Sequence, residues 1–481
     1  MSPPSRRQFI RHVAGSLVAL GSYPLTTRPA ENNTFDTRIV DAGAIRTLAS
    51  KLKGHLVTQG EPDYESARLV FNRAFDRHPA LIIYCASASD VARGLEFARN
   101  SKIPIAVRGG GHNRAGFSSC DNGVVLDLSR MNQVTVDAGK RIARADGGAL
   151  TINLDAATQS VGLATTSAGC PTVGLAGLTL GGGEGLLMSK YGAACDNLLS
   201  ARMVTVDGHQ VRVSQDANPE LFWAIRGGGG NFGIVTALEY RLYPLSEVLA
   251  GTLVYPNGRI PELLQAFAKF VADAPDEMNV VGQVVSSSDG AHFQMLVCHC
   301  GDARSGNALL ASLRSFKPQQ DDVRTMPYLQ ANATINPAAP AAHFQTNVFL
   351  PELSAAAIEA IATALSESPP NTRIFMVPIY GAITRVRLND TAFPMRSFGF
   401  ELDIMGRWAD AEARLRAIEW VRRLRDSLRP LARGAYVNQL GETSEELVRE
   451  AYGSHYIRLA SIKKKYDPQN VLQLNQNIKP D

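Results

Sequence analysis

The fold is decided by one stretch of sequence, IPIAVRGGGHN at residues 103–113. Its first five residues have the apolar, β-branched composition of a strand, which is predicted to run directly into the turn Arg108-Gly109. Consecutive glycines let a backbone approach a ligand closely and point several N–H groups into one concavity, because no side chain intervenes. Taken alone, the turn is equally compatible with a surface loop that carries an incidental histidine.

The segments before this stretch make it part of a βαβ unit. The run Leu81–Cys85 predicts a buried strand, and Ser89 with Asp90 predicts the capped start of the helix that follows. Ligands of such units bind at the carboxyl ends of the strands, which is where the glycine turn lies.

A second glycine-rich region follows further along the chain. Val124–Leu128 predicts a hairpin-like stretch, and Leu150–Val161 predicts a helix that Gly162 can terminate. Beyond them lie a turn around Cys170 and the cluster GLTLGGGEG at residues 177–185, which has too many small residues to be only a linker. We expect the two glycine-rich regions to cradle one ligand.

Further motifs occur in a fixed order after these. They are Lys190-Tyr191-Gly192 with Asp196-Asn197, the run Arg226–Thr236, and the ending Tyr466–Asn470 with Asn475–Ile478 after it. Together the motifs resemble the berberine bridge enzyme-like FAD-linked oxidases of the vanillyl-alcohol oxidase superfamily, from about residue 76 to the end. The resemblance implies an α+β fold, with a two-part PCMH-type FAD-binding domain plus an antiparallel-sheet substrate domain that has helices on one face.

The resemblance also implies how FAD is held. In relatives with two flavin attachments, the histidine of the first motif binds a ring methyl group and the cysteine of the second binds the adjacent ring carbon, so His112 and Cys170 are the implied attachment residues. A neutral imidazole and a thiolate are both nucleophiles, which suits bonding to an electron-poor ring. The predicted cofactor-binding residues are Arg108, Gly109, Gly110, Gly111, His112, Asn113, Gly169, Cys170, Thr172, Val173, Gly177, Thr179, Gly181, Gly182, Gly183, Gly185, Tyr191, Gly192, Asn197, Gly233, Val235 and Asn438.

The other five cysteines have no comparable context and are predicted to be small buried hydrophobic residues. They are Cys85, Cys120, Cys195, Cys298 and Cys300. The run Cys298-His299-Cys300 could suggest a metal site, but the residues before it alternate as in a strand, which puts neighbouring side chains on opposite faces. We therefore expect no metal there.

A Gly-x-Gly-x-x-Gly spacing occurs at Gly228, Gly230 and Gly233. In a nicotinamide-binding fold this motif lies between a strand and a helix, whereas here Asn218–Trp223 predicts a helix before it and Ile234–Tyr240 a strand after it. The context therefore argues against a nicotinamide site.

The amino-terminal residues 1–30 resemble a twin-arginine signal peptide. Ser5–Ile10 carries the paired arginines, and a short, moderately apolar segment follows that is too short for a stable membrane anchor. The alternative is a disordered basic tail. Removal of the four arginines of this segment takes the net charge from +4 to zero, which leaves no electrostatic argument for nucleic acid as a partner. We expect export to the periplasm or medium, with the twin-arginine translocase as a transient partner.

The remaining 451 residues are expected to divide into an FAD-binding domain over 76–247, a substrate domain over 250–430 and a carboxyl-terminal segment over 435–481 that returns to the FAD domain. In the middle part, several strand patterns alternate with amphipathic helices such as Pro261–Ala272. Near the end, a helix is predicted through Val448–Ile462, and the run Lys463–Lys465 that closes it is expected to face water.

Two tyrosines are predicted to act on the substrate. Tyr436-Val437-Asn438 resembles a family motif whose tyrosine removes the substrate proton and whose asparagine lies near the flavin; Tyr436 could otherwise be a half-buried strand residue. Tyr380 resembles a second family residue that lines the pocket. At Met395 many relatives have histidine, so no catalytic role is assigned to it.

These motifs predict an FAD-dependent oxidase that removes hydride from a small organic substrate, such as a sugar, polyketide, alkaloid or phenol, and reduces dioxygen to hydrogen peroxide. In the family, valine three residues after the attachment cysteine accompanies fast reaction with dioxygen, and here that residue is Val173. The alternatives are a dehydrogenase with another electron acceptor and a flavin-binding protein without turnover.

Overall fold

The glycine turn of residues 109–111 ends the third strand of a four-stranded sheet. The computed structural model describes residues 40–334 and 339–481, so the predicted signal peptide lies outside the described residues. The sheet has the order β1-β2-β4-β3, with β1 (His55–Thr58) antiparallel to β2 (Leu81–Tyr84). β4 (Val124–Asp127) lies between β2 and β3 (Ile105–Arg108) and is parallel to both. The hairpin-like stretch predicted at 124–128 is therefore wrong, since this segment is a central parallel strand.

The predicted βαβ unit is confirmed, with one change at the start of its helix. α4 (Ala88–Ser101) connects β2 to β3, and its capping residue is Ser87, whose side chain accepts a hydrogen bond from the backbone N–H of Asp90. Asp90 itself is buried and accepts hydrogen bonds from the backbone of Lys53 and Gly54. α2 (Ala42–Ala49) and α3 (Tyr64–Ala67) complete this part.

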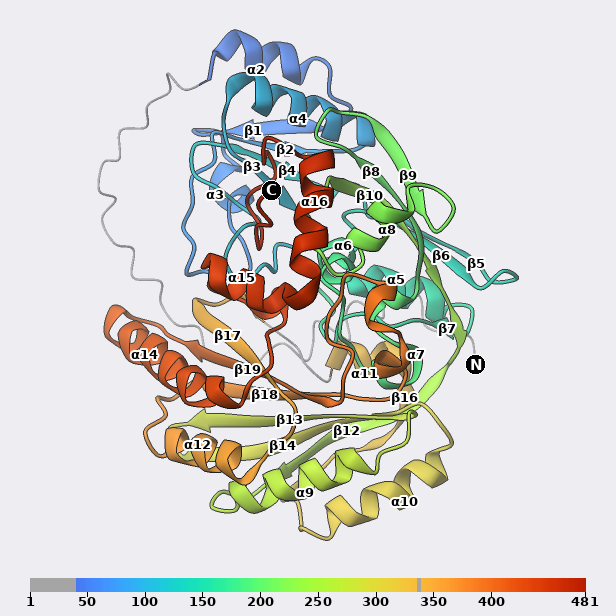
Figure 1. Ribbon diagram of the computed structural model, residues 1–481, viewed down its shortest axis with the longest axis vertical. Coiled ribbons are helices and arrows are strands. Elements are labelled where there is room, and N and C mark those ends of the chain that lie inside the picture. Colours follow the sequence, from blue (N-terminus) through green and yellow to red (C-terminus); the bar gives the residue numbers. More distant parts are fainter. Residues whose placement is uncertain (1–39, 335–338) are drawn as a thin grey trace. The chain divides into compact units, whose positions relative to one another are not determined.

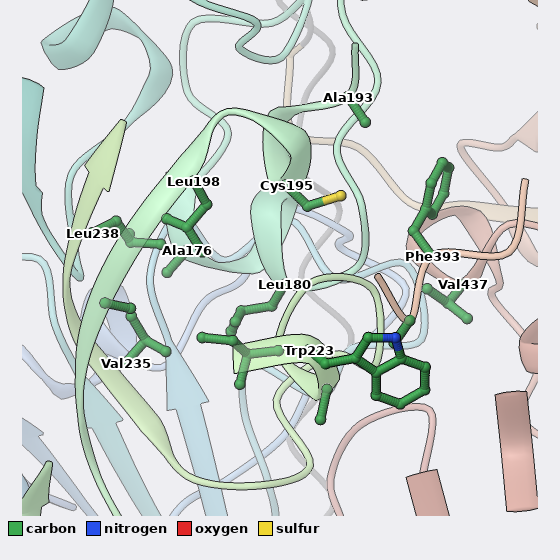
Figure 2. Packing of buried hydrophobic residues seen from close by; sticks show 14 of the residues in the cluster. Ala176, Leu180, Ala193, Cys195, Leu198, Trp223, Val235, Leu238, Phe393 and Val437 are labelled. Carbon is green, nitrogen blue, oxygen red and sulfur yellow. The ribbon is translucent and has the colours of Figure 1, made fainter. Parts of the chain in front are cut away.

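An antiparallel sheet of five strands forms the second part of the predicted FAD-binding domain, in the order β5-β6-β10-β8-β9. Its strands are β5 (Val134–Asp137), β6 (Ile142–Asp146), β10 (Ile234–Arg241), β8 (Leu198–Val204) and β9 (Gln210–Ser214). The helices here are α5 (Thr151–Gln159), α6 (Leu175–Leu180), α7 (Met188–Tyr191) and α8 (Pro219–Ala224), and β7 (Leu163–Ala164) pairs with β11 (Tyr243–Pro244). Figure 2 shows how Leu180 and Trp223 of this part share one apolar core with Phe393 and Val437 from later in the chain.

The middle of the chain forms an eight-stranded antiparallel sheet. Its strands are β12 (Glu247–Tyr255), β13 (Met278–Ser287), β14 (Gly290–His299), β15 (Gln320–Asp321), β16 (Arg324–Pro327), β17 (His343–Leu350), β18 (Thr372–Ile379) and β19 (Gly399–Arg407). The helices α9 (Ile260–Ala272), α10 (Ala303–Arg314), α12 (Ala355–Ser366) and α14 (Ala411–Leu428) lie along one side of it (Figure 1). Their apolar side chains and those of one sheet face form a single core. The predicted α+β fold, with helices on one face of an antiparallel sheet, is confirmed.

Two shorter helices follow the sheet strands. α11 (Tyr328–Thr334) packs against α5 and β12, and α13 (Ala382–Arg385) packs against α7. Within residues 40–334 and 339–481, no helix is both long and apolar enough to cross a membrane.

The carboxyl-terminal segment differs from its prediction in two respects. The single predicted helix is two helices, α15 (Glu445–Tyr452) and α16 (Tyr456–Tyr466), separated by a turn at Gly453–His455. Lys463, expected in water, is fully buried, because its ammonium group donates to Asp467 Oδ2 at 2.7 Å and to the carbonyls of Asn231 and Leu472 at 2.8 and 2.9 Å. Lys464 and Lys465 are exposed as predicted.

Candidate active site

A cavity of about 330 Å³ lies where the two predicted glycine-rich regions meet. Segments far apart in the sequence line it, including the turn after β3, the Cys170 turn, Gly229–Val235, Tyr436–Gln439 and Leu472–Gln476. The predicted cofactor residues on its wall are Gly109, Gly110, Gly111, His112, Asn113, Gly169, Cys170, Val173, Gly177, Gly233, Val235 and Asn438. We call this space the cofactor cavity.

The close approach of the two turns explains why glycine is needed in them. A Cβ on Gly110 would lie 2.4 Å from the backbone nitrogen of Gly174, and a Cβ on Gly174 would lie 2.4 Å from that of Gly110. Gly111 has φ +72°, a conformation that other residues rarely adopt. The wall formed by these turns is therefore backbone, and it leaves room for a ligand to contact peptide N–H groups.

His112 and Cys170 both contact the hydroxyl group of Thr172. Thr172 Oγ1 is 2.9 Å from His112 Nε2 and 3.6 Å from Cys170 Sγ. The His112 ring stacks on Phe71 with 3.9 Å between ring centroids. Burial lowers the pKa of His112 to about 3, and the nearby positive charge of Arg114 adds to this. The imidazole is therefore neutral at physiological pH, which is the form with a nucleophilic nitrogen.

Burial raises the pKa of the five other thiols. For Cys120 and Cys300 the pKa rises to about 12 and about 11, and those of Cys85, Cys195 and Cys298 also rise. These thiols stay protonated at neutral pH; Cys85, Cys120, Cys195 and Cys298 are buried as predicted, and Cys300 is half-buried.

Several predicted cofactor residues lie behind the wall and hold it in place. Arg108 is buried and donates to Asp127 Oδ2 and to the carbonyl of Ala67, both at 2.6 Å. Thr179 pairs with the Tyr240 hydroxyl at 2.7 Å.

The Tyr191–Asn197 region has the same supporting role. Tyr191 stacks on Tyr243, and Asn197 donates to the carbonyls of Tyr191 and Ala193. Gly192, at φ +80°, packs beside Asp196. No atom of these residues lines the cofactor cavity.

The glycines of the second cluster, residues 177–185, let other segments of the same chain approach it closely. A Cβ on Gly181 would lie 2.0 Å from the Asn438 side chain, one on Gly182 would lie 2.4 Å from the Phe393 ring, and one on Gly185 would lie 1.8 Å from the Ser167 carbonyl. Gly183 donates its N–H to the hydroxyl of Tyr436 at 2.9 Å. The cluster thus positions the residues around Tyr436.

Tyr436 lines the cofactor cavity and accepts two hydrogen bonds at its hydroxyl oxygen. The donors are the Gly183 N–H at 2.9 Å and Asn438 Nδ2 at 2.8 Å. Its backbone is held by the Asn347 side chain, which accepts from Tyr436 N at 2.6 Å and donates to Tyr436 O at 3.0 Å. Burial, reinforced by the charge of Glu184, raises the pKa of Tyr436 well above its usual value, although both N–H donors oppose this. The phenol is therefore neutral at rest.

A second cavity of about 150 Å³ adjoins the first. Arg114, Gly169, Glu184 and Gln439 line both. The rest of the second cavity is formed largely by the sheet face opposite the helices, with Asn279, Val281, Leu296, Arg373, Phe375, Val377, Asp403, Met405 and Arg407 on its wall. We call it the substrate cavity.

Three buried carboxyl groups gather near the substrate cavity. Burial raises the pKa of Glu184 to about 8 and that of Asp403 to about 7. Burial and the charges of its two neighbours also raise the pKa of Glu401 well above its usual value. Glu184 Oε1, Asp403 Oδ1 and both carboxyl oxygens of Glu401 have no hydrogen-bond partner among the described residues. The cluster is therefore able to hold or accept protons near neutral pH.

The structure does not bring Tyr380 to either cavity. Its ring lies in the core beneath the eight-stranded sheet, and its hydroxyl donates to the carbonyl of Met278. This placement gives no support to a catalytic role for Tyr380. Met395 is also buried in a core, so the departure from the family histidine lies away from the cavity walls.

The sequence predictions missed Arg114 and the carboxyl cluster. Arg114 follows His112 by two residues, and Glu184 lies inside the second glycine cluster. Glu401 and Asp403 alternate with Phe400, Leu402 and Ile404, which is the pattern of a strand with one polar and one apolar face. The polar face of β19 was therefore visible in the sequence.

Comparisons with known proteins agree with this site. A family model described as an FAD binding domain matches residues 79–214, and one described as berberine and berberine like matches 435–479. (R)-6-hydroxynicotine oxidase of Paenarthrobacter nicotinovorans is 32% identical, with 90% of this chain and 100% of that protein covered. The uncharacterized FAD-linked oxidoreductase YgaK of Bacillus subtilis is 30% identical, with 90% and 98% covered.

Solved structures show the same fold. The crystal structure of 6-hydroxy-D-nicotine oxidase from Arthrobacter nicotinovorans has a TM-score of 0.83 and 29% identity, covering 89% of this chain and 98% of that one. A histidine-to-alanine variant of berberine bridge enzyme, in a complex with (S)-reticuline, has a TM-score of 0.81 at 22% identity, with 91% of this chain and 98% of that one covered. The chain belongs to the berberine bridge enzyme-like family of FAD-linked oxidoreductases, and it is an FAD-linked enzyme.

Proposed function

We propose that this enzyme is an oxidase whose FAD is bound covalently to both His112 and Cys170. The observation that carries this is their placement in the wall of one cavity, both in contact with Thr172 Oγ1. The neutral imidazole of His112 and the glycine wall fit a flavin with its phosphates. FAD supplies a ring that accepts hydride from a substrate C–H bond and returns the electrons to dioxygen, which yields hydrogen peroxide.

Tyr436 and Glu184 are the pair that removes the substrate proton in this proposal. Two N–H donors point at the Tyr436 oxygen and favour its ionised form, but the phenol is neutral at rest and must lose its own proton to accept another. Glu184 lines both cavities, and the ionised form of its carboxyl group, whose pKa is about 8, can accept that proton. Asn438 keeps the phenol in place by donating to Tyr436 and to the Leu178 carbonyl.

Val173 supports the choice of dioxygen as electron acceptor. It lines the cofactor cavity and is half-buried, so its volume affects the space beside a bound flavin. The name of the relative (R)-6-hydroxynicotine oxidase agrees with an oxidase.

An anaerobic screen of alcohols, amines, sugars and phenols tests the proposed function. We expect at least one substrate to bleach the flavin without oxygen, and the colour to return at once in aerated buffer with release of hydrogen peroxide. If the flavin bleaches but its colour returns slowly in aerated buffer and quickly after a quinone is added, the enzyme is a dehydrogenase. Absence of bleaching with every class would favour a flavin-binding protein without turnover.

We further infer that the enzyme is exported by the twin-arginine route. This route carries folded proteins, which suits a chain that acquires FAD before export. The paired arginines that support it, Arg6 and Arg7, lie outside the described residues. Changing Arg6→Lys and Arg7→Lys together should leave the precursor in the cytoplasm, whereas unchanged export would refute the signal.

A further inference from the structure

Three arginines converge on the substrate cavity from separate elements. Arg114 follows the glycine turn, Arg373 lies on β18 and Arg407 ends β19. Arg373 pairs with Met405 across the two strands, so Arg407, two residues further, is its diagonal neighbour on the same sheet face. The cavity thus has a cluster of guanidinium groups at one place on its wall.

These guanidinium groups lack counter-ions in the described part of the chain. No carboxylate there lies within 4.0 Å of a nitrogen of Arg114, Arg373 or Arg407, whereas other half-buried arginines such as Arg425 are paired. Arg407 Nε is buried with no hydrogen-bond partner, and Arg373 lies over the Phe375 ring at 5.3 Å. Unpaired buried charge is costly, which makes these groups available for a bound anion.

The neighbouring carboxyl groups neutralise the arginines only in part at neutral pH. Glu184, Glu401 and Asp403 share one buried region, and like charges so close together cannot all ionise. Arginine, in contrast, keeps its proton throughout the physiological range. The fixed charge of the cavity is therefore positive, and protonated carboxyl groups can donate hydrogen bonds to a ligand's oxygens.

We propose that the substrate cavity recognises a carboxylate group of the substrate through Arg373 and Arg407. This inference rests on the proposed function and names its substrate class, a small organic acid. The two arginines line only the substrate cavity, while Gly169, Glu184 and Gln439 line both cavities. The carboxylate therefore lies in the substrate cavity and outside the cofactor cavity, and the carbon to be oxidised lies where the two cavities adjoin.

The walls between these ends fit an apolar substrate body. Val281, Leu296, Phe375, Val377 and Met405 line the cavity beside the arginines. An aromatic or branched aliphatic acid is thus the class that matches both the charge and the apolar surface.

Titration calorimetry of the holoenzyme with three isosteric probes tests the inference without any turnover. The probes are benzoate, neutral benzamide and the cation benzylammonium. We expect benzoate to bind at least about tenfold more tightly than benzamide, since hydrogen bonds to charged groups contribute that much. Equal binding of benzoate and benzamide, or tighter binding of benzylammonium, would overturn the inference.

Variants show whether the arginines cause the preference. Arg373→Met and Arg407→Met should each remove most of the preference for benzoate over benzamide, and Arg373→Lys should retain part of this preference. The control is Arg416→Met, which changes an exposed arginine on α14 and should leave the preference unchanged. An undiminished preference in both Met variants would assign the anion elsewhere and refute the proposal. The heat of binding does not depend on covalent flavin attachment or on reaction with dioxygen. Failure of this test can therefore be distinguished from failure of the proposed oxidase function.

Discussion

The cofactor cavity and the substrate cavity adjoin, yet they are built in opposite ways. The first is walled by backbone from glycine turns, with a neutral histidine and a cysteine on its wall. The second is walled by side chains from several strands and holds buried acids and arginines. Backbone walls suit a ligand whose phosphates and ring are common to the family, and side-chain walls can change with the substrate at little cost to the fold.

The largest expected effect lies at the boundary of the two cavities. Tyr436→Phe keeps the ring and removes the proton acceptor, so substrate reduction of the flavin should slow by about two to four orders of magnitude while folding and the flavin spectrum survive. Stopped-flow mixing under anaerobic conditions measures this rate. Glu184→Gln provides the matched test: a normal rate in Tyr436→Phe with a slow one in Glu184→Gln would move the base from the phenol to the carboxylate.

Removal of the buried ion pair between Lys463 and Asp467 tests what stabilises the wall of the cofactor cavity. Lys463 ties α16 to Asn231 and to Leu472, which lines the cofactor cavity. Lys463→Met leaves Asp467 buried without its partner, which should cost about 3–5 kcal/mol of unfolding free energy. Urea unfolding measures this loss, and Lys464→Met, at an exposed neighbour, is the control. If both variants lose equally little unfolding free energy, the carboxyl-terminal segment does not depend on this ion pair.

Much of the cofactor cavity could be predicted from the sequence, because its parts are runs of consecutive residues. The strand before Gly109, the turn at Cys170 and the position of the run Gly228–Gly233 before β10 follow from local patterns. The burial of Lys463 could not be foreseen in this way, because its acceptor at Asn231 comes from a distant segment and its acceptor at Leu472 from the irregular segment after α16.

The substrate cavity was largely missed for the same physical reason. The register of β18 on β19 places Arg373 beside Arg407, and no short motif specifies that register. The alternation at Glu401 and Asp403 indicated a polar sheet face but not what that face meets. Tyr380 shows the converse case, since its segment resembles the family's while its side chain lies in a core.

A smaller effect is expected when the cofactor cavity is narrowed. Val173→Leu adds one methylene beside the space for a bound flavin, and such overpacking costs about 1–3 kcal/mol, or about ten- to a hundredfold in rate. Reoxidation of the photoreduced enzyme by air should slow by this factor, and substrate reduction should change little. A Leu variant that reoxidises as fast as the wild type would argue against gating of dioxygen at this position.

An effect of similar size is a pH dependence that belongs to the substrate cavity. A carboxylate must be ionised to accept a proton, and the pKa of Glu184 is raised to about 8. The anaerobic reduction rate should therefore rise with pH up to about 8 and level off above it, falling by about tenfold per pH unit well below. Glu184→Gln should flatten this profile. A rate that decreases as pH rises from 6 to 8 would contradict the assignment.

Acid denaturation of the purified enzyme tests the central claim most directly, because only covalent bonds keep flavin with an unfolded chain. The account predicts that the wild-type pellet stays yellow, that His112→Ala and Cys170→Ala each keep one bond and their colour, and that the double variant releases all its FAD to the supernatant. Peptide mass spectrometry of the wild type should find the flavin on the peptides of both His112 and Cys170. Free FAD in the wild-type supernatant would contradict the account.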